Sequence, residues 1–248
     1  MRRLALLALA LWLAGTQCPV AGTSTTHADP PVQASADGNE AVLDEVWRTV
    51  RDHFFDPGLH GLDWTAVRAH YAPQAATAAS DEELATVINA MLAELHASHT
   101  ELYTPDEPAY YQLADIFAGA LRHRGLDRVF PGGKITYPGI GIFTRPDAAG
   151  HIFVRGVIEG APAQQAGLQV GDEIIAADAE PFRPVLSFRS KVGTPVALSI
   201  RRHADGPIEQ IAVTPTQLQP HEMFLQGLKA SARLIPTHNG MRIGYAHV

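Results

Sequence analysis

Apolar residues in the N-terminal part of the chain repeat at helical spacing. Between Asn39 and Phe54 they fall on one face of a helix, which Asn39 can cap and Asp56-Pro57-Gly58 ends. A second, short helix follows the potential cap Asp63 and is expected to end at Pro73, since proline lacks a backbone donor. The pattern predicts a compact group of helices.

The third helix has the clearest start signal in the chain. Ser80 and Glu83 have the spacing of a capping box, in which side chains and backbone amides exchange hydrogen bonds. The apolar stripe that follows consists of Leu84, Val87, Ile88, Met91, Leu92 and Leu95. These three helices predict a helical domain over residues 39–105, with residues 106–136 as a connector.

Short strands and turns replace the helical pattern from Tyr137 onward. Before that point, the apolar spacing from Tyr110 to Leu121 predicts one more helix, and Pro131-Gly132-Gly133 breaks the chain after it. The predicted strands are Gly141–Arg145, His151–Val157, Glu173–Ala177, Val196–Arg201 and Glu209–Thr214. Short helices are expected over Ala161–Ala166 and Arg183–Lys191.

The C-terminal stretch adds a helix and a strand. Residues 216–240 are expected to be a linker that contains a helix over His221–Ala232 and a turn at Asn239-Gly240. Residues 241–248 read as a strand, whose edge needs a pairing partner. The expected fold class is therefore α+β, with three N-terminal helices, a β-domain over residues 137–215 and a final strand.

Composition and charge narrow the class of protein. The 248 residues carry a net charge of −7 with histidine neutral and contain no long basic run, which argues against nucleic acid as a partner. Arg2 and Arg3 precede an apolar run, Leu4–Ala14, with the layout of a secretory signal peptide. We expect residues 1–28 to be removed on export, residues 29–38 to form a flexible linker, and the mature chain to be periplasmic or extracellular.

Cys18 is the single cysteine of the chain. Leu13-Ala14-Gly15 resembles the start of a lipoprotein box, but Thr16 and Gln17 separate it from the cysteine. Removal of Cys18 with the signal peptide is therefore favoured over a lipid anchor at that residue. No disulfide can then form within the mature chain.

Residues 137–215 resemble a PDZ domain. The motifs that carry the resemblance are Tyr137-Pro138-Gly139-Ile140-Gly141-Ile142, Gly160-Ala161-Pro162-Ala163-Gln164-Gln165-Ala166-Gly167-Leu168, Val170-Gly171-Asp172-Glu173-Ile174-Ile175, Gly193-Thr194-Pro195-Val196 and Ser199-Ile200-Arg201-Arg202. Gly139 and Gly141 let backbone amides converge into a nest suited to a terminal carboxylate. The alternative is that these glycines only form a tight hairpin.

A peptide-binding groove follows from this resemblance. The strand after the glycines can add a bound peptide as a further strand, which gives Gly139, Ile140, Gly141, Ile142 and Phe143 as candidate contacts. The resemblance implies that the opposite wall is the short helix near Val185 and Phe188. The expected partners are proteins or peptides bound by their C-terminal carboxylate.

The helical domain carries a second resemblance. Its motifs are Val46-Trp47-Arg48, the run from Phe54 to Trp64 (FFDPGLHGLDW), Tyr71-Ala72-Pro73 and Leu95-His96-Ala97-Ser98-His99-Thr100. Together with the PDZ-like domain and the Ile243-Gly244-Tyr245 strand, they resemble tail-specific (C-terminal processing) serine proteases of the tricorn-like branch. The resemblance spans about residues 40–248.

The resemblance assigns a catalytic role to His99, with Ser98 as a neighbour that helps to orient it. Neutral imidazole is a suitable base for activating a serine hydroxyl. The residues alone favour a polar helix end for this stretch, and the catalytic interpretation depends on the family motif; His96 has no assigned role. His96 and His99 could also suggest a metal pair, but spacing places no third ligand, so neither a metal nor another cofactor is expected.

A nucleophile is missing from the sequence. No Gly-x-Ser-x-Gly motif occurs, and the lysines are Lys134, Lys191 and Lys229, none of which suits a serine–lysine dyad. The resemblance implies that the nucleophilic serine and the oxyanion hole lie in an α/β core domain that begins near Met241.

Two functions follow from these observations. The favoured one is the N-terminal portion of an exported serine endopeptidase that recognises protein C-termini and is inactive without its core domain. The alternative is a non-catalytic periplasmic adaptor built from the helical and PDZ-like domains.

Overall fold

The computed structural model describes residues 36–237 and 240–247. The expected signal peptide, Cys18, the linker up to residue 35, Asn239 and Val248 lie outside the described residues. The chain divides into two compact units, one ending at Thr104 and one beginning at Pro105. Within the described residues, no helix combines the length and apolar character needed to span a membrane.

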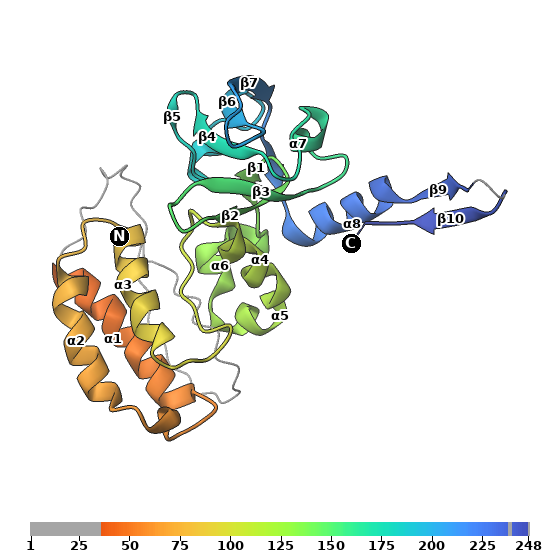
Figure 1. Cartoon of the computed structure of the whole chain (residues 1–248). Helices are drawn as coiled ribbons and strands as arrows, with labels where there is room; N and C mark the ends of the chain where they lie inside the picture. Colours follow the sequence, from red (N-terminus) through yellow and green to blue (C-terminus); the bar gives the residue numbers. More distant parts are fainter. Residues whose placement is uncertain (1–35, 238–239, 248) are drawn as a thin grey trace. The chain divides into compact units, whose positions relative to one another are not determined.

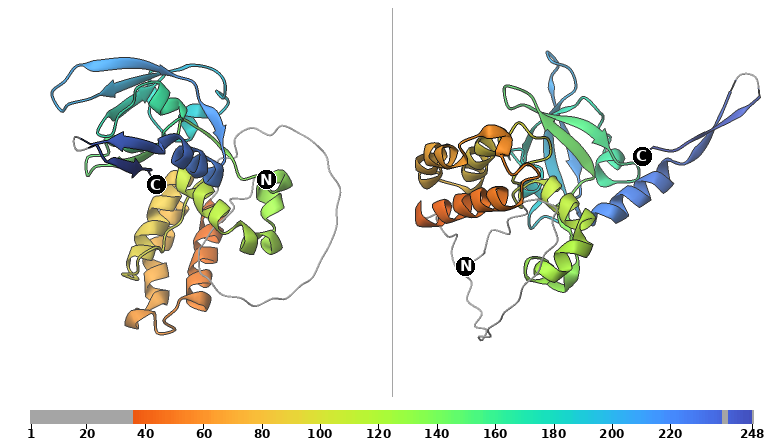
Figure 2. Two further views of the ribbon diagram at one scale, coloured as in Figure 1. Left: turned by 90° about the vertical axis from the view of Figure 1, so that its right-hand side faces the viewer. Right: turned by 90° about the horizontal axis from the view of Figure 1, so that it is seen from below.

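The first unit is a group of three helices that lie side by side (Figure 1, Figure 2). They are α1 (Ala36–His53), α2 (Trp64–Ala76) and α3 (Asp81–Ala93), with the 3₁₀ turn η1 (Leu59–Gly61) between the first two. Their shared core contains Leu43, Val46, Trp64, Leu84, Ile88, Met91 and Leu95. The predicted helices and their apolar faces are confirmed.

Two predicted helix boundaries are wrong. Helix α1 begins at Ala36, within the expected linker, so Asn39 lies inside the helix instead of capping it. Asn39 is buried, and its side-chain amide donates to the carbonyl of Ala78 at 2.9 Å. Helix α2 continues past Pro73 to Ala76. A proline removes one intrahelical hydrogen bond, and tertiary packing of Ala75 into the core holds the last turn in place.

The caps of α2 and α3 agree with the sequence. Asp63 accepts a hydrogen bond from the amide of Ala66 at 3.0 Å, and Ser80 accepts one from the amide of Glu83 at 3.2 Å. The Glu83 carboxylate closes the capping box through the amide of Ala79 at 2.8 Å. These bonds satisfy amides that have no partner inside the helix.

The second unit begins with short helical segments instead of the single predicted helix. They are α4 (Pro108–Ile116), α5 (Ala118–Leu121), η2 (Arg122–Arg124), α6 (Leu126–Val129) and η3 (Pro131–Gly133). Phe117 leaves the helical region with φ −99° and ψ 13°, and Gly125 adopts a left-handed conformation. These two residues divide the apolar stripe into separate turns.

A twisted sheet forms the centre of this unit, with strand order β2-β3-β4-β6-β7 (Figure 1). Its strands are β2 (Ile142–Pro146), β3 (Ile152–Val157), β4 (Glu173–Ala177), β6 (Val196–Arg201) and β7 (Ile208–Val213), all antiparallel to their neighbours, and β5 (Glu180–Pro181) pairs with β4. All the predicted strands are present, within one residue at their ends. The buried face of the sheet contains Ile140, Val154, Ile174, Phe188, Leu198 and Ile200.

Two short elements frame this sheet. Helix α7 (Pro162–Gln165) matches the first predicted short helix, whereas Arg183–Lys191 forms only the 3₁₀ turn η4 (Leu186–Phe188). Pro184 and the positive φ of Ser190 (66°) leave little room for a longer helix. A further pair, β1 (Tyr137–Gly139) and β8 (Thr216–Leu218), has no counterpart among the predicted strands.

The C-terminal segment supplies its own strand partner. Helix α8 (Pro220–Ser231) is followed by β9 (Arg233–Pro236), which pairs antiparallel with β10 (Arg242–Tyr245). The pairing partner that the predicted final strand needs is therefore supplied by Leu234 and Ile235, which lie in the expected linker and form a strand. The apolar side chains of this hairpin stay exposed, among them Leu234, Met241 and Ile243.

Replacing Asn39 with alanine is expected to destabilise the first unit by about 1–3 kcal/mol, because the buried carbonyl of Ala78 loses its donor. Unfolding in urea, followed by the fluorescence of Trp47 and Trp64, measures this unit because both residues belong to it. Gln74→Ala is the matched control, since the exposed Gln74 side chain bonds only the carbonyl of His70 on its own helix. Equal effects of the two substitutions would contradict the tertiary role of Asn39.

Candidate peptide-binding and catalytic sites

The glycine loop links β1 to β2 and is held by backbone hydrogen bonds. The carbonyl of Ile140 accepts from the amide of Ala163 at 2.9 Å, and the carbonyl of Gly141 accepts from the amide of Ile158 at 2.9 Å. Gly141 has a φ of +78°, a conformation that side-chain-bearing residues rarely adopt. The loop is therefore pinned between the end of β3 and the first turn of α7.

Close packing favours glycine at both positions, and at Gly141 the positive φ favours it as well. A Cβ at Gly139 would lie 2.7 Å from Cδ1 of Leu218, and a Cβ at Gly141 would lie 2.3 Å from the Cβ of Ala161. Non-bonded carbon atoms prefer about 3.5–4.0 Å, so a side chain at either position would push the loop away. The sequence argument that these glycines permit close backbone approach is thus supported by their surroundings.

Strand β2, which follows the loop, lies at one end of the strand order and pairs with β3. Ile142 packs toward the buried face of the sheet, next to the core residue Ile140. Phe143 lies over Gly156 of β3, and its ring stacks on Phe224 of α8 with centroids 5.7 Å apart. An edge strand beside an amide-rich loop is the arrangement that peptide addition to a sheet needs.

Val185 and Phe188 do not line an open slot. Both side chains are fully buried, Phe188 within the sheet core and Val185 in a separate cluster with Tyr137, Leu218 and Met223. The short η4 turn places these side chains inward. Neither side chain is therefore accessible to a peptide in this structure.

The cluster around Val185 contains contacts that the sequence did not reveal. Tyr111 of α4 stacks on Tyr137 with ring centroids 5.0 Å apart, and burial raises the pKa of Tyr137 to about 12. The Asp106 carboxylate pairs with both Arg183 and Arg189. Because these residues lie about 80 positions apart in the chain, no local sequence pattern could have linked them.

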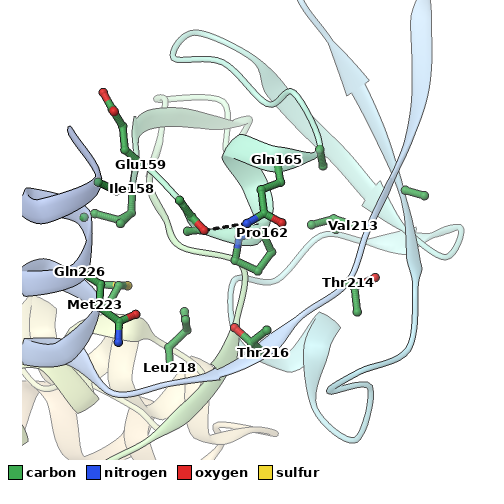
Figure 3. Close-up of a pocket in the computed structure, with 16 residues that line it drawn as sticks. Ile158, Glu159, Pro162, Gln165, Val213, Thr214, Thr216, Leu218, Met223 and Gln226 are labelled. Atoms are coloured by element: carbon green, nitrogen blue, oxygen red, sulfur yellow. Dashed lines mark hydrogen bonds between the residues drawn. The ribbon is translucent and has the colours of Figure 1, made fainter. Parts of the chain in front are cut away.

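A pocket of about 630 Å³ lies on another side of the same unit, between α7, α8 and the β7–β8 connection (Figure 3). Leu218 and Ala161, which touch the glycine loop, also line this pocket. Its rim is polar, with Glu159, Gln165 and Thr216.

The predicted catalytic histidine lies in an exposed turn just after α3. His99 has a φ of 62° and His96 a φ of 48°, so both occupy the left-handed region that is uncommon for such residues. Ser98 and His99 are exposed, and among the described residues no hydrogen bond joins them. The expected orienting role of Ser98 therefore has no contact to support it here.

Tertiary hydrogen bonds fix both ends of this turn. The amide group of Asn89 binds the backbone of Leu102 twice, at 2.7 and 3.0 Å. At the other end, Nδ1 of His60 lies 2.9 Å from the carbonyl of Leu95. Asp56 accepts hydrogen bonds from the amides of His60 and Gly58, which lower the pKa of its carboxyl. Residues 96–101 thus form a loop between two fixed points.

No metal centre is apparent in the part of the chain that the structure describes. A group of three or more potential metal ligands from histidine, cysteine, aspartate and glutamate does not occur among these residues. The His96 and His99 pair therefore gains no third ligand within residues 36–237 and 240–247.

Comparison with known families assigns a domain to each unit. Residues 37–93 match the family model of the tricorn protease C1 domain, and residues 153–202 match that of a PDZ domain. A putative tricorn protease homolog 2 from Streptomyces coelicolor is 27% identical over 92% of this chain and 19% of its own length. The chloroplastic carboxyl-terminal-processing peptidase 3 of Arabidopsis thaliana is 27% identical over 65% of this chain and 29% of its own length. The chain thus spans less than a third of each of these relatives.

Two solved structures match parts of this chain weakly. A photosystem II D1 C-terminal processing protease covers 73% of this chain and 44% of its own, at 19% identity and a TM-score of 0.40. The PDZ domain of a carboxy-terminal protease from Vibrio cholerae, in complex with a peptide, covers 34% of this chain and 97% of its own, at 20% identity and a TM-score of 0.27. With scores this low, the domain assignment depends on the family matches and on the sheet itself.

A pair of glycine substitutions can separate the two reasons for glycine at position 141, which are the lack of space for a side chain and the positive φ. Gly141→Ala is expected to cost more stability than Gly150→Ala by about 1–3 kcal/mol, because the new methyl group at residue 141 collides with Ala161. Gly150 is the matched control, since it also has a positive φ (88°) but no atom within 4 Å of the position that a Cβ would take. Urea unfolding followed by far-ultraviolet circular dichroism measures both variants, and equal losses would show that conformation alone requires glycine.

Proposed function

We propose that this chain is the substrate-recognising N-terminal part of an exported serine-type endopeptidase of the tail-specific protease family. Its first unit contains a tricorn protease C1 domain and its second a PDZ domain, and its relatives include tricorn homologues and carboxyl-terminal-processing peptidases. The observation that carries the proposal is the order of these two domains on one chain. Neither domain alone would distinguish a peptidase from an adaptor.

The PDZ domain is proposed to bind the free C-terminus of a substrate protein. The pinned loop Gly139–Gly141 offers closely packed backbone amides to a carboxylate, and β2 offers a strand edge to the preceding residues. Recognition of a chain end would hold one part of the substrate while another part reaches the catalytic groups. Effective concentration then favours cleavage of the tethered chain.

His99 is proposed as the general base. Its exposed imidazole is accessible to a serine hydroxyl, and its loop is fixed by Asn89 and His60 at both ends. A base must lie within hydrogen-bond reach of the proton that it removes, which requires such a fixed loop. We place the serine nucleophile and the oxyanion donors in the core domain that the family resemblance implies.

Export is proposed from the N-terminal sequence. Arg2 and Arg3 followed by the apolar run Leu4–Ala14 are typical of a secretory signal. Fusion of residues 1–28 to a reporter enzyme that is active only outside the cytoplasm tests this part of the proposal separately.

A peptide with a free apolar C-terminus is expected to bind the chain about 5- to 150-fold more tightly than its C-terminal amide. The amide lacks the negative charge that converging backbone amides favour, a difference of about 1–3 kcal/mol. Titration calorimetry with a matched acid and amide pair measures it. Equal affinities of the two peptides would contradict carboxylate recognition. If neither peptide bound, peptide binding by this domain would be contradicted.

In the protein extended through its core domain, His99→Ala is expected to lower kcat/KM by about 10²-fold or more, because the general base is lost. His96→Ala is the matched control in the same exposed loop and should have a much smaller effect. The measurement is cleavage of an unstructured protein with an apolar C-terminus. Residues 29–248 without the core domain serve as the negative control, and we expect them to show no turnover. Full activity of the His99 variant would mean that this histidine only ends the helix.

A further inference from the structure

We propose that residues 105–111 form an intramolecular latch that keeps the peptide groove of the PDZ domain closed until a substrate C-terminus displaces it. This inference depends on the proposed peptide recognition and adds its regulation. The latch consists of the Asp106 carboxylate, which bridges two arginines of the groove wall, and the Tyr111 ring, which covers the cluster behind them.

The groove is bounded by β2 and by the segment 183–189. Val185 from that segment is a buried member of one cluster and Phe143 from β2 packs against it, so β2 and the segment meet at this cluster. Val185 is fully buried, and Gly139 to Gly141 at the closed end of the groove are buried as well. A groove ready for a peptide would instead leave these surfaces accessible.

Tyr111 belongs to this cluster although it comes from α4. Its ring packs against the Val185 cluster and stacks on Tyr137 at 5.0 Å with an interplanar angle of 24°. Its hydroxyl donates to the carbonyl of Pro105 at 3.0 Å, which ties the ring to the start of the same segment. Tyr111 therefore occupies apolar space that a peptide side chain could fill.

Asp106 holds the segment on the groove wall. One carboxylate oxygen lies 3.3 Å from Nη2 of Arg183, and the other accepts a hydrogen bond from Nη2 of Arg189. Arg189 also reaches the carbonyl of Pro105 at 3.5 Å. Burial and the positive charge of the neighbouring Arg189 lower the pKa of Arg183. The Asp106 carboxylate binds both arginines and so offsets the repulsion between their charges.

The strength of these contacts suits a reversible closure. The Asp106 side chain is 24% exposed, and those of Arg183 and Arg189 are 38% and 46% exposed. Ion pairs with this exposure contribute little individually and are screened by salt. The latch can therefore yield to a peptide that supplies strand hydrogen bonds and a terminal carboxylate.

Asp106→Asn is expected to bind a peptide with a free apolar C-terminus about three- to tenfold more tightly than the wild-type chain. The substitution removes the charge that holds the latch and so raises the fraction of open domains, on which apparent affinity depends. Titration calorimetry with a synthetic peptide of about ten residues measures the affinity. In the wild-type chain, hydrogen exchange of residues 105–111 is expected to become faster when the peptide is added.

Glu209→Gln is the matched control, because Glu209 lies on β7, at the opposite end of the strand order from β2, and pairs there with Arg202. It should leave the affinity within about twofold of wild type, as expected for an exposed pair. Equal affinity of wild type and Asp106→Asn, with unchanged exchange of residues 105–111, would overturn the latch while peptide recognition stands. Absence of binding to both proteins would overturn the recognition on which the latch depends.

Discussion

The close approach of the Gly139–Gly141 backbone to its neighbours is the constraint on which the rest of the second unit depends. Leu218 and Ala161 occupy the space that side chains at these two positions would need. This contact sets the start of β2, brings the first turn of α7 against the loop, and places β8 beside β1. A glycine loop, an edge strand and the first turn of a helix are thereby assembled around one tight turn.

The same unit packs Tyr111 against the cluster at which we propose that the peptide groove is closed. Tyr111, Tyr137 and Val185 form an apolar cluster where a ligand side chain would be expected, and charged groups around Asp106 close its margin. Burial of this apolar surface stabilises the closed state, at roughly 25 cal/mol for each Å² removed from water. Peptide binding would have to replace these contacts with its own, so the apparent affinity reflects both states.

In the loop of residues 96–101, hydrogen bonds from neighbouring segments hold an unfavourable backbone conformation. His96 and His99 adopt left-handed conformations that their side chains do not favour, within a turn whose ends are fixed by Asn89 and His60. Non-glycine residues persist in this region only where the surrounding structure holds them. The geometry gives His99 a defined and accessible position, which is the property that a general base requires.

The sequence by itself determined the three N-terminal helices, the five longer strands of the sheet and the family resemblance. Local signals, such as the Ser80 and Glu83 capping box and the alternating strands, depend on near neighbours, and so they could be predicted. The glycine motif identified the loop because only glycine tolerates its geometry. Only the tertiary structure decided that Asn39 donates a hydrogen bond to the carbonyl of Ala78, that β9 pairs with β10, and that Asp106 bridges two arginines. These contacts join residues that are distant in the chain or lie in segments without a strong pattern, so their energies appear only when the chain is folded.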